Sequence, residues 1–129
     1  MDPYLHRNWV EQAHRDATMQ PLNAIAATLE CVLSRRLVAV IVGVKDGKTV
    51  ARWASGSVSE IRDAAVEQRL RTTFQIVQML MQSSDAPQTI KAWFIGLNPQ
   101  LDDTSPAEAI REGHLTDALA AARAFVIGG

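Results

Sequence analysis

The chain has 129 residues, 47% of them apolar, which fits one folded domain and excludes a disordered tail. Charge is unevenly spread along the chain. Residues 1–34 hold two basic and four acidic residues, and residues 35–71 hold eight basic and four acidic residues. Residues 72–129 hold three basic and six acidic residues. A basic centre suits a DNA-contacting element, with a different partner at the acidic end. The longest apolar run, residues 37–44, is far short of the roughly 20 residues of a membrane span. No secretory signal is visible, so we expect a cytoplasmic protein without a membrane segment.

Most of the chain shows helical periodicity, and the expected fold class is all-α. Residues 1–20 are assigned to an N-terminal extension. From residue 22 to residue 33, apolar residues then recur at steps of three and four, which predicts a helix. Cys31 lies within it, and its apolar neighbours predict a buried thiol.

A long helix is expected next, from about Ser57 to Met81, because Ser57 and Glu60 have the spacing of a capping box. Glu67 and Arg71, one turn apart, form a supporting pair. We assign residues 61–86 to this connecting helix. A short helix follows Pro87, a second capping box begins at Ser105, and a last helix runs from residue 115 to residue 126.

Residues 37–49 allow two interpretations. An apolar strand followed by a glycine loop ending in Gly47, Lys48 and Thr49 would resemble a phosphate-binding loop, and hence a small NTPase. That pattern needs four residues between its glycines, and only three separate Gly43 from Gly47. The chain also lacks a second apolar strand ending in aspartate to hold the metal.

The alternative is a helix-turn-helix, which we place within residues 21–60. Residues 37–42 form a first short helix, residues 43–47 the turn, and residues 48–55 a second helix that Gly56 ends. Val50 and Trp53 then face the core. Side chains on the opposite face and in the turn are free to enter a major groove and contact phosphates or base edges. The DNA-binding candidates are Lys45, Lys48, Thr49 and Arg52.

The sequence VKDGKTVARWASG at residues 44–56 resembles the Xre-type helix-turn-helix, although its turn is one residue longer than usual. AWFIGLNPQL at residues 92–101 and SPAEAIREG at residues 105–113 resemble the C-terminal toxin-binding domain of Xre/MbcA/ParS antitoxins. AARAF at residues 121–125 resembles the final helix of that domain. The similarity covers about residues 30–127, and Phe94 departs from the leucine that is frequent there.

The resemblance implies an antitoxin of a type II toxin–antitoxin system. Such proteins neutralise RES-type toxins, which consume NAD or transfer ADP-ribose from it. They cover the active-site entrance of the toxin and repress their own promoter. The implied partners are a cognate RES-type toxin, promoter DNA and a second copy of the chain within a hetero-oligomer. The toxin-binding domain is expected at residues 87–129, and its contact candidates are Arg111, Glu112, His114, Asp117 and Arg123.

No catalytic or metal-binding constellation emerges from the sequence. His6 and His14 have no cysteine or paired carboxylate at ligand spacing, so we expect no metal site and no cofactor. The serines lack a neighbouring histidine, and we expect a binding protein and not an enzyme. The alternative function is a helix-turn-helix transcription regulator without a toxin partner, whose C-terminal domain serves dimerisation.

Overall fold

The computed structural model describes residues 10–13, 20–83 and 85–128, and within these ranges the chain is helical and contains no strand. The all-α prediction is therefore confirmed. Most of the predicted N-terminal extension, including His6 and His14, lies outside the described residues. The helices in chain order are α2 (Leu22–Leu33), α3 (Arg35–Val42), α4 (Gly47–Ser55), α5 (Ala64–Gln82), α6 (Pro87–Ile95), the 3-10 turn η1 (Pro99–Leu101), α7 (Pro106–Arg111) and α8 (Leu115–Gly128).

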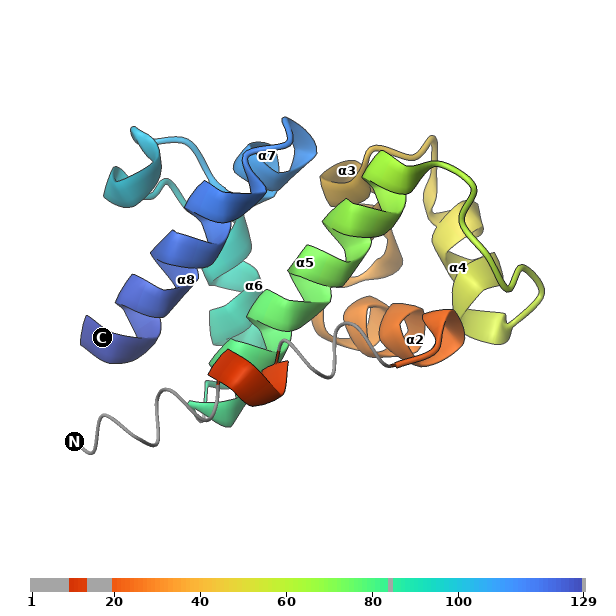
Figure 1. The fold of residues 1–129 in the computed structure, drawn as a ribbon, viewed down its shortest axis with the longest axis horizontal. Helices are drawn as coiled ribbons and strands as arrows, with labels where there is room; N and C mark the ends of the chain where they lie inside the picture. Colours follow the sequence, from red (N-terminus) through yellow and green to blue (C-terminus); the bar gives the residue numbers. More distant parts are fainter. Residues whose placement is uncertain (1–9, 14–19, 84, 129) are drawn as a thin grey trace.

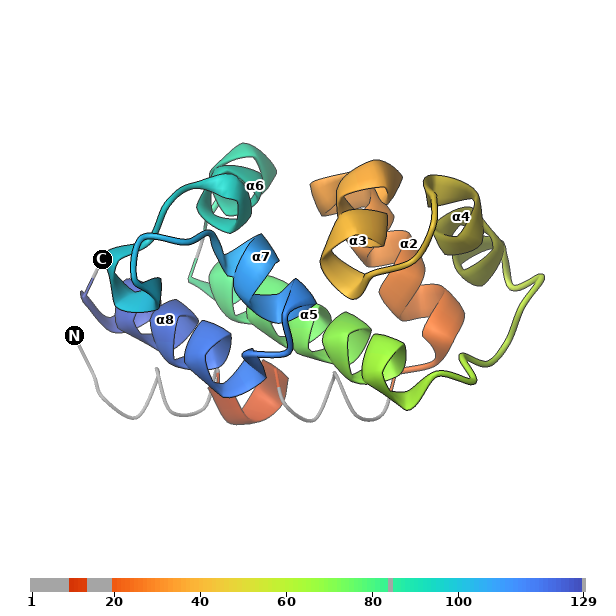
Figure 2. The ribbon, with the colours of Figure 1, turned by 90° about the horizontal axis from the view of Figure 1, so that it is seen from above.

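The long helix α5 runs through the middle of the molecule (Figure 1). Helices α2, α3 and α4 gather at one end, and α6, α7 and α8 at the other, an arrangement that is also clear when the molecule is seen from above (Figure 2). The two groups touch directly, because α2 contacts α6 and α3 contacts α7. Helix α5 packs against members of both groups.

One continuous hydrophobic core joins the two ends. Leu29 of α2, Ile41 of α3, Leu70 of α5, Phe94 of α6 and Ile110 of α7 are all fully buried in it. A core shared in this way resists separation of the two groups, because pulling them apart would expose apolar area at roughly 25 cal/mol per Å².

The long helix begins later than the sequence predicted. Helix α5 starts at Ala64, and residues 57–63 form a connection without regular secondary structure instead of its first turns. The carboxylate of Asp63 caps the helix by accepting from the backbone amides of Ala65 (2.9 Å) and Val66 (3.3 Å). The Ser57 hydroxyl lies 2.9 Å from the Ser55 hydroxyl and does not cap α5. The predicted start at Ser57 is wrong because the chain must cross from α4 to α5 before a helix can begin.

The predicted burial of Cys31 is also wrong, because the thiol is exposed. Helix α2 buries Ile25, Leu29 and Leu33. Cys31 follows Leu29 by two residues, which is about 200° around a helix of 3.6 residues per turn, and therefore lies opposite that stripe.

Two other local predictions are confirmed. The Ser105 side chain accepts from the backbone amide of Glu108 at 3.1 Å, with Pro106 at the first helical position of α7. Glu67 and Arg71 form an ion pair at 3.2 Å. None of the described helices combines the length and the apolar character that crossing a membrane requires.

Candidate nucleic-acid interface

The turn between α3 and α4 is built from residues with special backbone roles. Gly43 ends α3 in the left-handed conformation (φ 83°), which glycine adopts without the Cβ clash of other residues. Asp46 then caps α4 by accepting from the amides of Lys48 (3.0 Å) and Thr49 (3.4 Å). The predicted turn at residues 43–47 and the second helix, here Gly47–Ser55, are confirmed.

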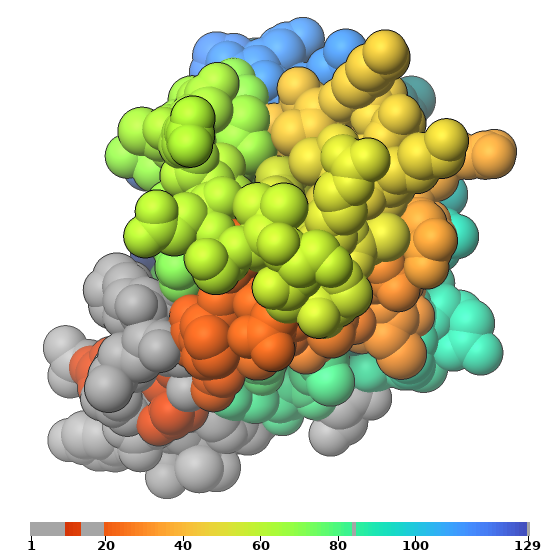
Figure 3. Space-filling model, turned by 90° about the vertical axis from the view of Figure 1, so that its right-hand side faces the viewer, coloured from red at the N-terminus to blue at the C-terminus, as the bar shows by residue number. Residues whose placement is uncertain are grey.

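Helix α4 is anchored on one face only. Val50 is fully buried and Trp53 is 4% exposed, and the helix packs on α2 and α3. Lys48 and Arg52 are exposed, and Thr49 is half-buried beside Lys48. The space-filling view from this end shows α4 and the connection that follows it on the surface (Figure 3).

Some basic side chains at the α2–α4 end form ion pairs with acidic side chains, and others do not. Arg35 is paired with Glu30 at 3.3 Å. Within the described ranges no ion pair involves Lys45, Lys48 or Arg52, so all three charges face solvent. Unpaired, exposed lysine and arginine side chains are the groups that neutralise phosphates in protein–DNA contacts.

The capping carboxylate limits what the start of α4 can do. The amides of Lys48 and Thr49, which could otherwise donate to a phosphate, already donate to Asp46. Anion binding here therefore depends on the side chains of Lys45, Lys48 and Arg52 and not on the helix terminus.

The phosphate-loop interpretation of the same residues is wrong. It required a strand before the glycines, and residues 35–42 are helical. It also required free amides along the loop to cradle phosphates, and Asp46 holds two of them.

Two arginines outside the predicted set of DNA contacts support this end of the molecule. A Cβ added to Gly47 would lie 2.9 Å from Cγ of Arg35, so the Arg35 stem lies directly over the start of α4. Arg69 of α5 donates to the Val42 carbonyl at 3.2 Å, where α3 ends. In the sequence, the contact between Arg35 and α4 is indicated only by a glycine at the first position of that helix. No local pattern indicates the bond from Arg69 to the Val42 carbonyl, because residues 42 and 69 are distant in sequence.

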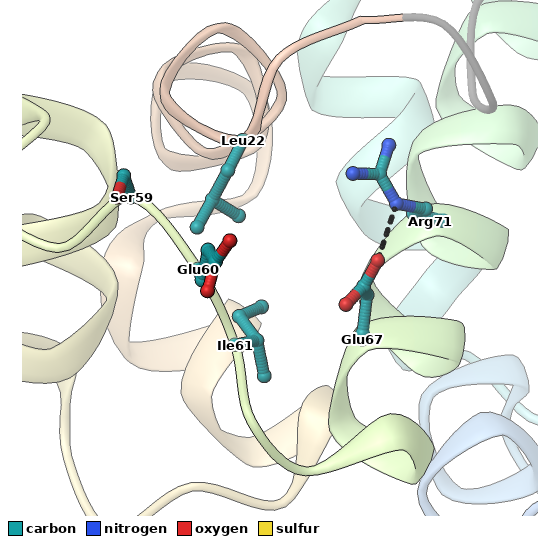
Figure 4. A pocket seen from close by; sticks show the side chains of 6 residues that line it. All are labelled: Leu22, Ser59, Glu60, Ile61, Glu67 and Arg71. Carbon is teal, nitrogen blue, oxygen red and sulfur yellow. Dashed lines mark hydrogen bonds and ion pairs between the residues drawn. The ribbon is translucent and has the colours of Figure 1, made fainter.

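A cavity of about 280 Å³ lies where the connection from α4 reaches α5. Leu22, Glu60 and Ile61 stand across it from Glu67 and Arg71 (Figure 4). Arg71 bonds Glu67 through Nε and donates from Nη1 to the Gln20 carbonyl at 3.2 Å. It therefore ties the start of α2 to α5, which is a structural role.

The toxin-binding candidates fall into two separate places. Arg111 and Glu112 end α7, His114 lies in the following turn, and Asp117 is in the first turn of α8. His114 Nε2 is 3.7 Å from Glu112 Oε2. Arg123 lies six residues beyond Asp117, about 9 Å further along α8 and 120° around it. All five are exposed, and the structure groups the first four without Arg123.

Comparison with known proteins does not extend this picture. No protein-family model, curated protein or solved structure matches the chain. The function of the chain is therefore inferred from its own residues and from the resemblance of its motifs.

Proposed function

We propose that this chain is the antitoxin of a type II toxin–antitoxin system. In this proposal it neutralises a RES-type toxin that consumes NAD or transfers ADP-ribose, by covering the active site, and it represses its own promoter. The supporting observation is the division of surface chemistry between the two ends of the molecule. Lys48 and Arg52 project from α4 at one end, while the acidic, motif-bearing α6–α8 group forms the other.

The DNA-binding role is supported by the geometry of α3, the turn and α4. Val50 and Trp53 hold α4 against the body of the protein, and the opposite face carries unpaired positive charge. A short surface helix held in this way is the usual reading element of a helix-turn-helix.

The toxin-binding role is supported by residues 92–113, whose motif residues shape the second end. Leu101 and Pro106 are buried and Pro99 opens η1, so these residues maintain the domain. The exposed residues of α7 and α8 remain available to a partner.

Co-expression tests the proposal. A RES-type protein encoded beside this chain is expressed in bacteria alone and together with the full chain, and cellular NAD and growth are measured. We expect the toxin alone to deplete NAD and stop growth, and the pair to grow normally. Binding of a promoter fragment is measured in parallel. Promoter binding without protection would instead identify a transcription regulator that has no toxin partner.

A further inference from the structure

An apolar groove separates the α6–η1 segment from the second half of α8. It is an open groove of about 430 Å³, lined mainly by Trp93, Leu97, Pro99, Ala121, Ala124 and Phe125, with the uncharged amides of Asn98 and Gln100 at one side. No charged side chain of the described chain lines it. A volume in this range holds ligand-sized groups, and a neutral lining favours an uncharged apolar occupant.

The rim of the groove is apolar and rigid. Leu97 is 76% exposed, more than any other large apolar side chain described. The loop that follows it is fixed by three short bonds: the Asn98 amide to the Thr104 carbonyl (2.9 Å), and the amides of Leu101 (2.9 Å) and Asp103 (3.0 Å) to the Asn98 carbonyl. A partner that covers Leu97 therefore buries apolar area, and binding costs little conformational entropy because the backbone of this loop is already ordered.

The Trp93 ring forms one wall of the groove. The Trp93 ring packs edge-on to Phe94, with centroids 5.1 Å apart, and is tilted against Phe125 at 6.3 Å. These contacts fix the indole, and its Nε1 is buried with no acceptor among the described residues. An occupant of the groove therefore meets the face or edge of the fixed ring and not the N–H, and the ring supplies apolar contact area.

The surroundings of the groove are acidic. Asp102 and Asp103 are exposed in the loop that supplies the groove lining. Asp117 lies one helical turn before Ala121 and so shares the groove face of α8, whereas Arg123 points away from it. Two symmetric copies of the chain would bring these acids together, which disfavours a second copy as the occupant.

We propose that this groove docks an extended segment of the toxin. The segment inserts an aliphatic side chain between Leu97 and the Trp93 ring and carries a lysine or arginine that faces Asp102, Asp103 or Asp117. The inference rests on the proposed function and deepens it, because it places the main toxin contact on apolar residues next to Asp117.

Three variants of the full chain test the docking. Leu97→Asp places a charge in the rim, and Trp93→Phe reduces the apolar wall of the groove but keeps an aromatic ring. Ile127→Asp is the matched control, since Ile127 is 64% exposed on α8 but does not line the groove. The RES-type protein that is encoded beside this chain is made by cell-free synthesis, and its affinity for each variant is measured by calorimetry. The fold of each variant is checked by circular dichroism.

We expect Leu97→Asp to weaken toxin binding by about ten-fold or more, as for central interface residues, and Ile127→Asp to change it by less than about two-fold. Trp93→Phe should weaken binding by a smaller factor than Leu97→Asp, because a smaller aromatic ring still forms part of the groove wall. In the wild-type complex the Trp93 indole N–H resonance should shift.

Three results would overturn the inference, each in a distinguishable way. If the wild-type chain fails to bind the toxin, the proposed function fails and the docking fails with it. If the wild type binds and Leu97→Asp binds equally well, only the groove assignment fails. If Leu97→Asp lowers the molar mass of the free protein in light scattering, the groove is occupied by a second copy.

Discussion

The two ends of this protein share one core but present opposite surfaces. The α2–α4 end exposes positive charge at Lys45, Lys48 and Arg52, which form no ion pair with another described residue. The α6–α8 end is acidic and exposes large apolar side chains, Ile95 at 56%, Leu97 at 76% and Ile127 at 64%. The two surfaces therefore offer different attractions: long-range, salt-sensitive attraction at one end, and burial of apolar area at the other.

The largest expected effect is on the free energy of unfolding, and its measurement tests whether the two ends form one folding unit. Trp53→Ala at one end and Phe94→Ala at the other should each lower the free energy of unfolding by about 3–5 kcal/mol, because both side chains are buried. Both variants should unfold in one transition in urea, followed by circular dichroism, because the core is continuous. Two separate transitions in either variant would show that the ends fold independently.

The next effect concerns DNA. Arg52→Ala should weaken binding to a promoter fragment by about 1–3 kcal/mol if the side chain reads a base, and wild-type affinity should fall steeply with salt. Fluorescence anisotropy at several salt concentrations measures both. Arg123→Ala, which removes the same charge at the opposite end, is the control and should leave the affinity unchanged. An unaltered affinity in Lys48→Ala/Arg52→Ala would remove α4 from the DNA contact.

Two helix-capping residues allow an effect on stability to be distinguished from an effect on DNA binding. Asp46→Ala and Asp63→Ala each remove a capping carboxylate and should each cost about 1 kcal/mol of stability in urea. Only Asp46→Ala should also tighten DNA binding, because it removes a negative charge beside Lys48 and frees two amides. Equal DNA affinities of the two variants would place the start of α4 away from the phosphates.

The smallest effect concerns the ion pair on α5. Glu67→Gln removes the negative charge that pairs with Arg71 and should lower stability by about 0.3–0.5 kcal/mol, because the pair is partly exposed and screened by solvent. The loss should shrink in 1 M salt, as measured by urea unfolding. A salt-independent loss would mean that the Glu67 contacts are steric and not electrostatic.

The sequence by itself determined the helical class and the local signals that need only neighbouring residues. The buried stripe of α2, the Gly43–Gly47 turn, the faces of α4 and the Ser105 cap all follow from spacing within one or two turns. The same spacing misplaced the start of α5, because Ser57 matches a capping pattern and only the path from α4 to α5 selects Asp63 instead.

Only the tertiary structure decided which distant residues meet. Three features join residues more than ten positions apart in the sequence. They are the contact of the Arg35 stem with Gly47, the bond from Arg69 to the Val42 carbonyl, and the groove between α6–η1 and α8. Periodicity assigns a residue to a face of its own helix but does not state which helix covers that face. For this reason the sequence selected the charged residues of α7 and α8 as contacts and missed Leu97, whose exposure depends on how the 98–104 loop folds back on itself.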